Sequence, residues 1–214
     1  FKLSHTELDI TNFAQLKGFF YFNRIDIVIH TATKGGSRLK EDSLLDFYEN
    51  ILMLENLLFF KNKRLYTKLF IFSSGAAFDR RFSINGKHTS IPVDYYGLSK
   101  FVQSKIVLHE KNVYNLRLFN CFGPLEKDTR FIKTSIINYI NHKSIEIFED
   151  KLFDFFYIDD LYIIIKYFID KNDSADTLEL DCCYDKKLKL SEVAFIINSL
   201  SDYKVPININ KENG

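Results

Sequence analysis

Apolar runs that end in polar or small residues recur along the N-terminal part of the chain. They lie at Ile25–Thr33, Lys68–Ala77 and Val113–Phe119, and segments with helical spacing, Asn12–Phe22 and Leu44–Phe60, alternate with them. Uninterrupted apolar runs of this length are typical of strands covered on both faces of a parallel sheet. Strands that alternate with helices predict an α/β fold, in which ligands bind beyond the carboxyl ends of the strands.

Tyr96 and Lys100 stand four residues apart in the segment Val93–Glu110, which we expect to be a helix. On a helix, residues at this spacing lie on one face, one turn apart. A phenol with a pKa of ~10 exchanges protons poorly at neutral pH, but a nearby ammonium group favours the phenolate and lowers that pKa. The pair is therefore a candidate for acid–base catalysis. A chance Tyr-x-x-x-Lys spacing at the start of an amphipathic helix is the alternative interpretation.

Polar residues at the ends of two predicted strands flank this pair in the sequence. Ser73 and Ser74 stand before it, and Arg117-x-Phe-Asn120-x-x-Gly-Pro124 follows it. In this order and spacing, the motifs resemble those of the extended short-chain dehydrogenase/reductases. More narrowly, they resemble the NAD-dependent epimerase/dehydratase family that acts on nucleotide sugars. The resemblance runs from about Leu8 to about Leu200.

The resemblance implies a Rossmann-like parallel sheet flanked by helices, with a small C-terminal α/β lobe. We expect an NAD(P)-binding domain at residues 1–123 and a predominantly substrate-binding lobe at 124–214, interleaved with it. The family's first βαβ element and its Gly-x-x-Gly-x-x-Gly turn have no match in this sequence. We therefore expect the chain to be truncated at its N-terminus, by roughly 40 residues on the family's layout.

The catalytic roles that the resemblance implies fall on Tyr96, Lys100 and Ser74. Tyr96 would exchange a proton with a sugar hydroxyl, and Lys100 would tune Tyr96 and hold the nicotinamide ribose. Ser74 would orient the sugar oxygen by a hydrogen bond. The chain departs from many relatives at Gly75, where they carry the catalytic Ser or Thr, so the hydroxyl is assigned to Ser74.

The cofactor implied by the resemblance is NAD or NADP. Leu3–Ile10 is predicted to be a strand, and Asp9 and Ile10 at its end match a motif that approaches the adenine. A helix N-cap region is an equally good interpretation of Asp9. His30 is interpreted as a packed core residue rather than a catalyst. The positions expected to contact the cofactor are Asp9, Ile10, Thr31, Ala32, Thr33, Asn50, Ser73 and Lys100.

The substrate is expected to meet Asn120, which matches the family asparagine near the nucleotide-sugar diphosphate. Arg130 is a candidate for a substrate phosphate because guanidinium groups suit phosphate oxygens, and a solvated helix start is the alternative. Arg117 is interpreted as a structural ion-pair residue. The loop Lys34–Ser37, with its two glycines, is expected near the substrate at the carboxyl edge of the sheet. Phe153 replaces an arginine of the family's pattern, which removes one expected phosphate contact.

The expected reaction is hydride transfer at C4 of a nucleotide sugar. A 4-keto reductase is favoured and a 4-epimerase comes next. The dehydratase branch of the family places an Asp-Glu pair where this chain has Ala76 and Ala77, which offer no acid or base. A non-catalytic or degenerate Rossmann-like nucleotide-binding protein is the alternative, because Gly75 and Phe153 depart from the pattern.

The charge balance gives no reason to expect nucleic acid or a membrane as a partner, because the net charge is +1. The cysteines have neither disulfide nor metal spacing, so we expect a cytoplasmic protein with no metal site. Family members commonly dimerise through two helices, here Leu44–Phe60 and Tyr96–Glu110, so a homodimer is expected. Surface-polysaccharide synthesis is the setting that the family implies.

Overall fold

The structure is a computed structural model that describes residues 1–37, 40–79, 90–171, 176 and 178–210. Its contacts divide the chain into two compact units. Unit 1 comprises Phe1–Leu118 and Ile165–Asp181, and unit 2 comprises Phe119–Ile164 and Cys182–Gly214. The chain thus leaves unit 1 after the third strand and later returns to it.

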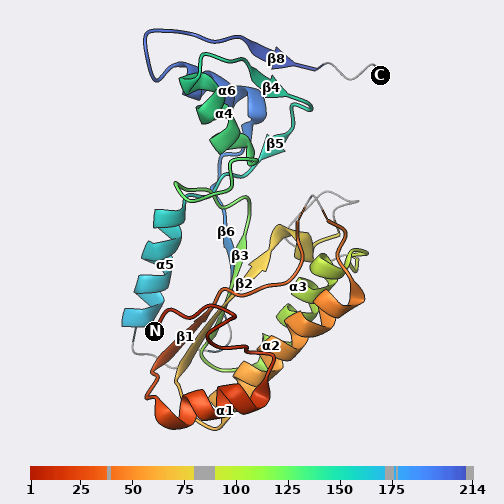
Figure 1. Ribbon diagram of the computed structural model, residues 1–214, viewed down its shortest axis with the longest axis vertical. Helices are drawn as coiled ribbons and strands as arrows, with labels where there is room; N and C mark the ends of the chain where they lie inside the picture. The colour runs from red at the N-terminus through yellow and green to blue at the C-terminus, as the bar shows by residue number, and fades with distance from the viewer. Residues whose placement is uncertain (38–39, 80–89, 172–175, 177, 211–214) are drawn as a thin grey trace. The chain divides into compact units, whose positions relative to one another are not determined.

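Unit 1 is built on a four-stranded sheet with the order β1-β2-β3-β6 (Figure 1). The strands are β1 (Ile27–His30), β2 (Lys68–Ser74), β3 (Val113–Leu118) and β6 (Leu178–Cys182). β1 and β3 each pair in parallel with β2, and Ser74 at the end of β2 stands opposite Leu118. The predicted α/β fold with a parallel sheet is confirmed.

The helices α1 (Phe13–Phe22), α2 (Leu44–Asn62) and α3 (Tyr95–Ile106) begin at side chains that cap free backbone N–H groups. Asn12 accepts from Ala14 and Gln15 before α1. Ser43 and Asp46 form a capping box before α2, and Asp94 caps α3. Figure 1 shows all three helices on the same side of the sheet.

Alternating residues of the strands bury the two faces of this sheet. Leu69, Ile71 and Val113 join a core with residues of α1 and α2. On the opposite face, the ring of Phe70 stacks on Tyr114, which in turn meets Phe168 of α5 (Ile158–Asp170). Both faces are therefore covered, as the apolar runs predict.

The predicted strand Leu3–Ile10 is wrong, because these residues form turns instead. The carboxylate of Glu7 accepts hydrogen bonds from both the backbone N–H and the hydroxyl of Ser4. Asp9 accepts in the same way from the N–H and hydroxyl of Thr11. Local side-chain acceptors of this kind compete with strand pairing. Leu8 and Ile10 still pack against the core of unit 1.

Unit 2 is smaller and has its own core. Its elements are α4 (Phe131–Ile140), β4 (Ile145–Ile147), β5 (Leu152–Phe153), β7 (Leu188–Lys189), α6 (Leu190–Asn198) and β8 (Ile207–Ile209). β4 pairs with β8 in parallel, and β5 pairs with β7 antiparallel. Tyr139, Ile145 and Ile197 belong to its buried cluster. Within the described residues, none of the helices combines the length and the hydrophobicity that crossing a bilayer requires.

Candidate active site

Ser74 is the last residue of β2, at the carboxyl edge of the sheet. The chain then turns into a single 3-10 turn, Gly75–Ala77, and the Ser74 Oγ accepts a hydrogen bond of 3.2 Å from the Ala76 N–H. This contact uses a lone pair of the oxygen. The hydroxyl proton can therefore still be donated to a substrate oxygen.

Gly97 brings the start of α3 against this turn. A Cβ atom built on Gly97 would lie 2.4 Å from the Ala76 carbonyl oxygen, so only glycine permits this approach. The Gly97 N–H is held by the Asp94 carboxylate at 2.7 Å. This contact therefore brings Tyr96, the residue before Gly97, close to the turn that follows Ser74.

Lys100 joins the same end of β2 from the next turn of α3. Its Nζ donates a 2.9 Å hydrogen bond to the carbonyl oxygen of Phe72, two residues before Ser74, and it lies 5.6 Å from the centre of the Tyr96 ring. The side chain is buried, and this burial lowers the pKa of Lys100 to about 8. The structure thus gathers Ser74, Tyr96 and Lys100 around the carboxyl end of β2.

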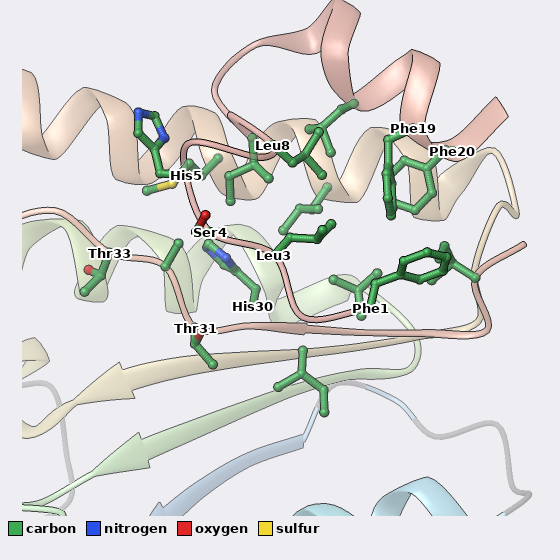
Figure 2. Close-up of a pocket in the computed structure, with 18 of the residues that line it drawn as sticks. Phe1, Leu3, Ser4, His5, Leu8, Phe19, Phe20, His30, Thr31 and Thr33 are labelled. Carbon is green, nitrogen blue, oxygen red and sulfur yellow. The ribbon is translucent and has the colours of Figure 1, made fainter. Parts of the chain in front are cut away.

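A cavity of about 420 Å³ lies beside β1, between the N-terminal segment, α1 and α2. Figure 2 shows Thr31 and Thr33 after β1, Phe19 and Phe20 from α1, and Leu3, Ser4, His5 and Leu8 from the N-terminal segment around it. Four positions expected to contact the cofactor line this cavity: Ile10, Thr31, Ala32 and Thr33. Its apolar inner part and its hydroxyl-bearing edge suit a base and a ribose respectively.

The remaining expected cofactor positions differ in how their side chains are used. Asp9 does not line the cavity, and it is not the N-cap of α1, which is Asn12. Hydrogen bonds from Thr11 hold the pKa of Asp9 below its usual range. Asn50 is buried, and its side-chain amide forms hydrogen bonds with the backbone of Lys34 and with the hydroxyl of Ser99.

Ser73 and Lys100 retain hydrogen-bonding capacity that a nicotinamide dinucleotide would use. Ser73 is 5% exposed, and its Oγ has no hydrogen-bond partner among the described residues. A buried hydroxyl without a partner costs stability unless a ligand satisfies it. The ammonium of Lys100 has three donors, and the described residues supply one acceptor, Phe72. The polar groups at the end of β2 therefore fit the expected cofactor.

His30 is buried at the end of β1 and also lines the cavity (Figure 2). Burial, reinforced by the charge of Lys100, lowers the pKa of His30 to about 4. The imidazole is therefore neutral at pH 7, which agrees with its interpretation as a core residue.

The substrate-side candidates belong to unit 2. Asn120 follows β3 with a φ of 44°, a left-handed conformation that asparagine tolerates well. Arg130 is the N-cap residue of α4, and its Nε lies 3.8 Å from the Glu126 carboxylate with the side chain 42% exposed. Arg117 is buried, with 2.8 Å ion pairs to both Glu179 and Asp181, which confirms its structural interpretation.

Sequence reasoning missed the importance of Gly97. Glycine inside a helix costs roughly 1 kcal/mol relative to alanine, so its presence in the third position of α3 is itself a signal of a close contact. That signal indicates a contact but does not identify Ala76 as the partner.

Comparison with known proteins places the chain in a family. The model of the NAD dependent epimerase/dehydratase family matches residues 2–180. No curated protein matches the chain in a sequence search. The fold resembles that of several solved structures, each below 25% sequence identity.

One of them is ADP-L-glycero-D-manno-heptose-6-epimerase from Helicobacter pylori, with 23% identity and a TM-score of 0.79 over 95% of this chain and 67% of that chain. Another is the GDP-mannoheptose C4 reductase from Campylobacter jejuni with NADP bound, with 18% identity and a TM-score of 0.84 over 98% and 78%. A third is a GDP-D-glycero-L-gluco-heptose synthase from Campylobacter jejuni, solved in the presence of NADPH, with 17% identity and a TM-score of 0.83 over 98% and 79%.

The chain thus spans 67% to 79% of these three solved chains. The matched segment, residues 2–180, includes β1, β2, α3 and β3, and therefore Ser74, Tyr96 and Lys100. The chain belongs to the NAD dependent epimerase/dehydratase family, a family of enzymes.

Proposed function

We propose that the protein reduces the C4 keto group of a nucleotide-linked sugar with NADH or NADPH. The observation that carries this proposal is the gathering of Ser74, Tyr96 and Lys100 at the carboxyl end of β2. A hydroxyl, a phenol and an ammonium group at one strand end can bind a carbonyl oxygen and supply its proton.

Each residue has a distinct role in the proposed step. The hydroxyl of Ser74 donates a hydrogen bond to the C4 oxygen, and Tyr96 transfers its phenolic proton to that oxygen as the carbonyl becomes an alcohol. The charge of Lys100 stabilises the phenolate that remains on Tyr96, because the two side chains lie on one face of α3. When bound, the dinucleotide supplies the hydride.

The cofactor would lie along the ends of β1 and β2. We assign its contacts to Asp9, Ile10, Thr31, Ala32, Thr33, Asn50, Ser73 and Lys100. The cavity beside β1 supports the four positions that line it, Ile10, Thr31, Ala32 and Thr33, and the Oγ of Ser73, which has no partner among the described residues, supports a fifth. On the substrate, Asn120 and Arg130 would bind the nucleotide diphosphate, since both are polar and partly accessible residues of unit 2.

Two buried alanines favour reduction over dehydration. Ala76 and Ala77 directly follow the Ser74–Gly75 pair, and they carry no group that could remove or add a proton. A 4-epimerase would use the same three residues, and it is the second candidate.

A homodimer is part of the proposal. The exposed face of α2 carries Leu45, Tyr48 and Leu52, which are 65%, 60% and 41% exposed and recur at helical spacing. Such an apolar stripe is suited to packing against a second copy. We also place the enzyme in the cytoplasm, since the spacing of Cys121, Cys182 and Cys183 provides no disulfide framework.

The test uses the full-length gene product with NADH or NADPH and a panel of nucleotide 4-keto-6-deoxy sugars. Absorbance of the reduced cofactor reports turnover. We expect oxidation of the cofactor in the wild type and its loss in Tyr96→Phe, whereas Tyr95→Phe should keep it. Tyr95 is the matched control because it is the adjacent tyrosine and is 39% exposed.

The other outcomes separate the alternatives. An inverted sugar product with no net cofactor oxidation, detected by NMR, would replace the reductase with the epimerase. Cofactor binding without conversion of any sugar in the panel would favour a nucleotide-binding protein without activity.

A further inference from the structure

The loop after β1 lies directly on the ring of Tyr96. A Cβ atom built on Gly36 would be 3.0 Å from both Cε2 and Cζ of that ring, and Cζ is the carbon that carries the hydroxyl. Gly36 has a φ of +74°, a conformation that other residues rarely adopt. The backbone at Gly36 is therefore the surface against which this part of the phenol rests.

Two side chains hold this loop in place. The Asp42 carboxylate accepts a 2.7 Å hydrogen bond from the Gly36 N–H. The buried amide of Asn50 accepts from the N–H of Lys34 at 2.8 Å and donates to the Lys34 carbonyl at 3.0 Å. The loop is thus fixed at Gly36 itself and two residues before it.

Asn50 also reaches the helix that carries Tyr96. Its Nδ2 donates to the Ser99 Oγ at 3.3 Å, and the Ser99 hydroxyl donates to the Tyr96 carbonyl at 2.7 Å. Gln103, one turn further along α3, donates to the Asn50 carbonyl at 2.8 Å. One buried residue of α2 therefore links the loop to the first turns of α3.

We propose that Gly36 is a positioning residue for Tyr96: its backbone, held by Asp42 and Asn50, fixes the phenol ring in the orientation from which it transfers its proton. The inference rests on the proposed function, in which Tyr96 is the proton donor. A side chain at position 36 would push the ring, and with it the hydroxyl, away from this orientation. Misplacement of a catalytic group by about 1 Å can lower the rate on the order of 100-fold.

The test compares three glycine-to-alanine variants. Gly36→Ala introduces a Cβ against Tyr96. Gly35→Ala, at a φ of +78°, would place its Cβ 2.5 Å from the Asp42 Oδ1 that accepts from the Gly36 N–H, so it disturbs what holds the loop and adds no atom at the ring. Gly18→Ala, in α1, has no neighbouring atom within 4 Å and is the neutral control. The comparison of Gly36→Ala with Gly18→Ala therefore measures the effect of a methyl group at the ring against one in open space.

We expect Gly36→Ala to lower kcat on the order of 10- to 100-fold while KM changes little. The pH profile of kcat should also shift, since the ring moves relative to Lys100. Gly18→Ala should stay within about threefold of the wild-type kcat, whereas Gly35→Ala should lower kcat in the same direction as the loss of Asp42. Asp42→Ala should reduce kcat, and Asp42→Asn should restore it because asparagine keeps an acceptor oxygen for the Gly36 N–H.

A second readout does not depend on turnover. In protein with ¹³C-labelled tyrosine, the ring resonance of Tyr96 is the one that disappears in Tyr96→Phe. We expect Gly36→Ala to move this resonance and its titration midpoint, and Gly18→Ala to leave both in place. A Gly36 variant with wild-type kcat and resonance would overturn the proposal. Absence of turnover in the wild type would refute the proposed function alone, and the resonance would still decide the role of Gly36.

Discussion

A Cβ atom on Gly97 would lie 2.4 Å from the carbonyl oxygen of Ala76, so helix α3 and the turn after Ser74 meet backbone to backbone. This contact sets the separation between the turn that carries the hydroxyl of Ser74 and the helix that carries the phenol of Tyr96. Ser74 ends a strand and Tyr96 lies in the first turn of a helix. The distance between them is therefore set by how these two elements pack. The geometry of the candidate active site therefore depends on a residue that has no side chain.

Replacement of Gly97 by alanine should damage both stability and activity. The added methyl group cannot be accommodated without moving α3 or the turn, and such overpacking costs roughly 1 to 3 kcal/mol. We expect a lower free energy of unfolding in urea and a kcat reduced on the order of 10- to 100-fold. Gly18→Ala should instead stabilise the protein slightly, since alanine favours a helix and nothing lies within 4 Å of the new Cβ. Wild-type kcat in Gly97→Ala would contradict the positioning role.

The adjacent serines at the end of β2 should respond differently to alanine. Ser74→Ala removes the proposed donor to the sugar oxygen, and loss of one such donor typically lowers kcat about 100- to 1,000-fold. Ser73→Ala removes a buried Oγ that has no partner among the described residues. It should leave the free energy of unfolding unchanged or raise it, and weaken cofactor binding. Calorimetric titration with NADPH measures the weaker cofactor binding expected for Ser73→Ala, and steady-state kinetics measure the lower kcat expected for Ser74→Ala. Equal losses of kcat in both variants would be evidence against the assignment of the hydroxyl to Ser74.

Sequence patterns were sufficient for most elements of unit 1 because those elements are set by local chemistry and by a strong period. The apolar run that begins at Lys68 and the helix that begins at Leu44 appear as predicted, since Ser43 caps the helix and both faces of β2 are buried. The prediction of a strand at Leu3–Ile10 is wrong because only Leu8 and Ile10 keep the two-residue spacing of a strand, whereas the acceptors Glu7 and Asp9 close turns within the segment.

The candidate residues of the site follow from the sequence one by one, but their arrangement in space does not. The four-residue spacing placed Lys100 beside Tyr96, and the resemblance added Ser74. The carbonyl of Phe72 as the acceptor for Lys100, and Gly36 as the surface under Tyr96, join segments that are remote in the sequence. Such pairs depend on how the elements pack, and no local pattern encodes them.

The burial of Lys100 should make stability depend on alkaline pH. Burial lowers its pKa from 10.5 to about 8, so between these values the unfolded chain binds a proton that the folded chain does not. The free energy of unfolding therefore rises with pH across this window, and this residue contributes about 3 kcal/mol to the rise. The difference in unfolding free energy between wild type and Lys100→Met, measured in urea from pH 7 to 10.5, should follow this rise. If the difference in unfolding free energy did not change with pH, the pKa of Lys100 would not be lowered by burial.

His30 should make the protein sensitive to acid. Its pKa is lowered from 6.5 to about 4, first by burial and then by the charge of Lys100. Between these values the unfolded chain binds a proton that the folded chain excludes. The free energy of unfolding therefore falls as pH falls, by about 3 kcal/mol across this range. His30→Gln should remove this part of the acid sensitivity in urea unfolding at pH 7 and pH 4.5. His5→Gln is the control, because the side chain of His5 is 65% exposed.

A charge on the exposed face of α2 should separate the proposed homodimer into monomers. Tyr48 is 60% exposed and stands between Leu45 and Leu52 on this face, so Tyr48→Glu would bury an unpaired carboxylate if the face packs against a second copy. Sedimentation velocity should then show a dimer for the wild type and a monomer for Tyr48→Glu. Phe22→Glu makes the same kind of change at an 81% exposed position on α1 and should stay dimeric. A dimer that survives Tyr48→Glu would place the interface on another surface, because a partly desolvated carboxylate at its centre would cost more than the association could retain.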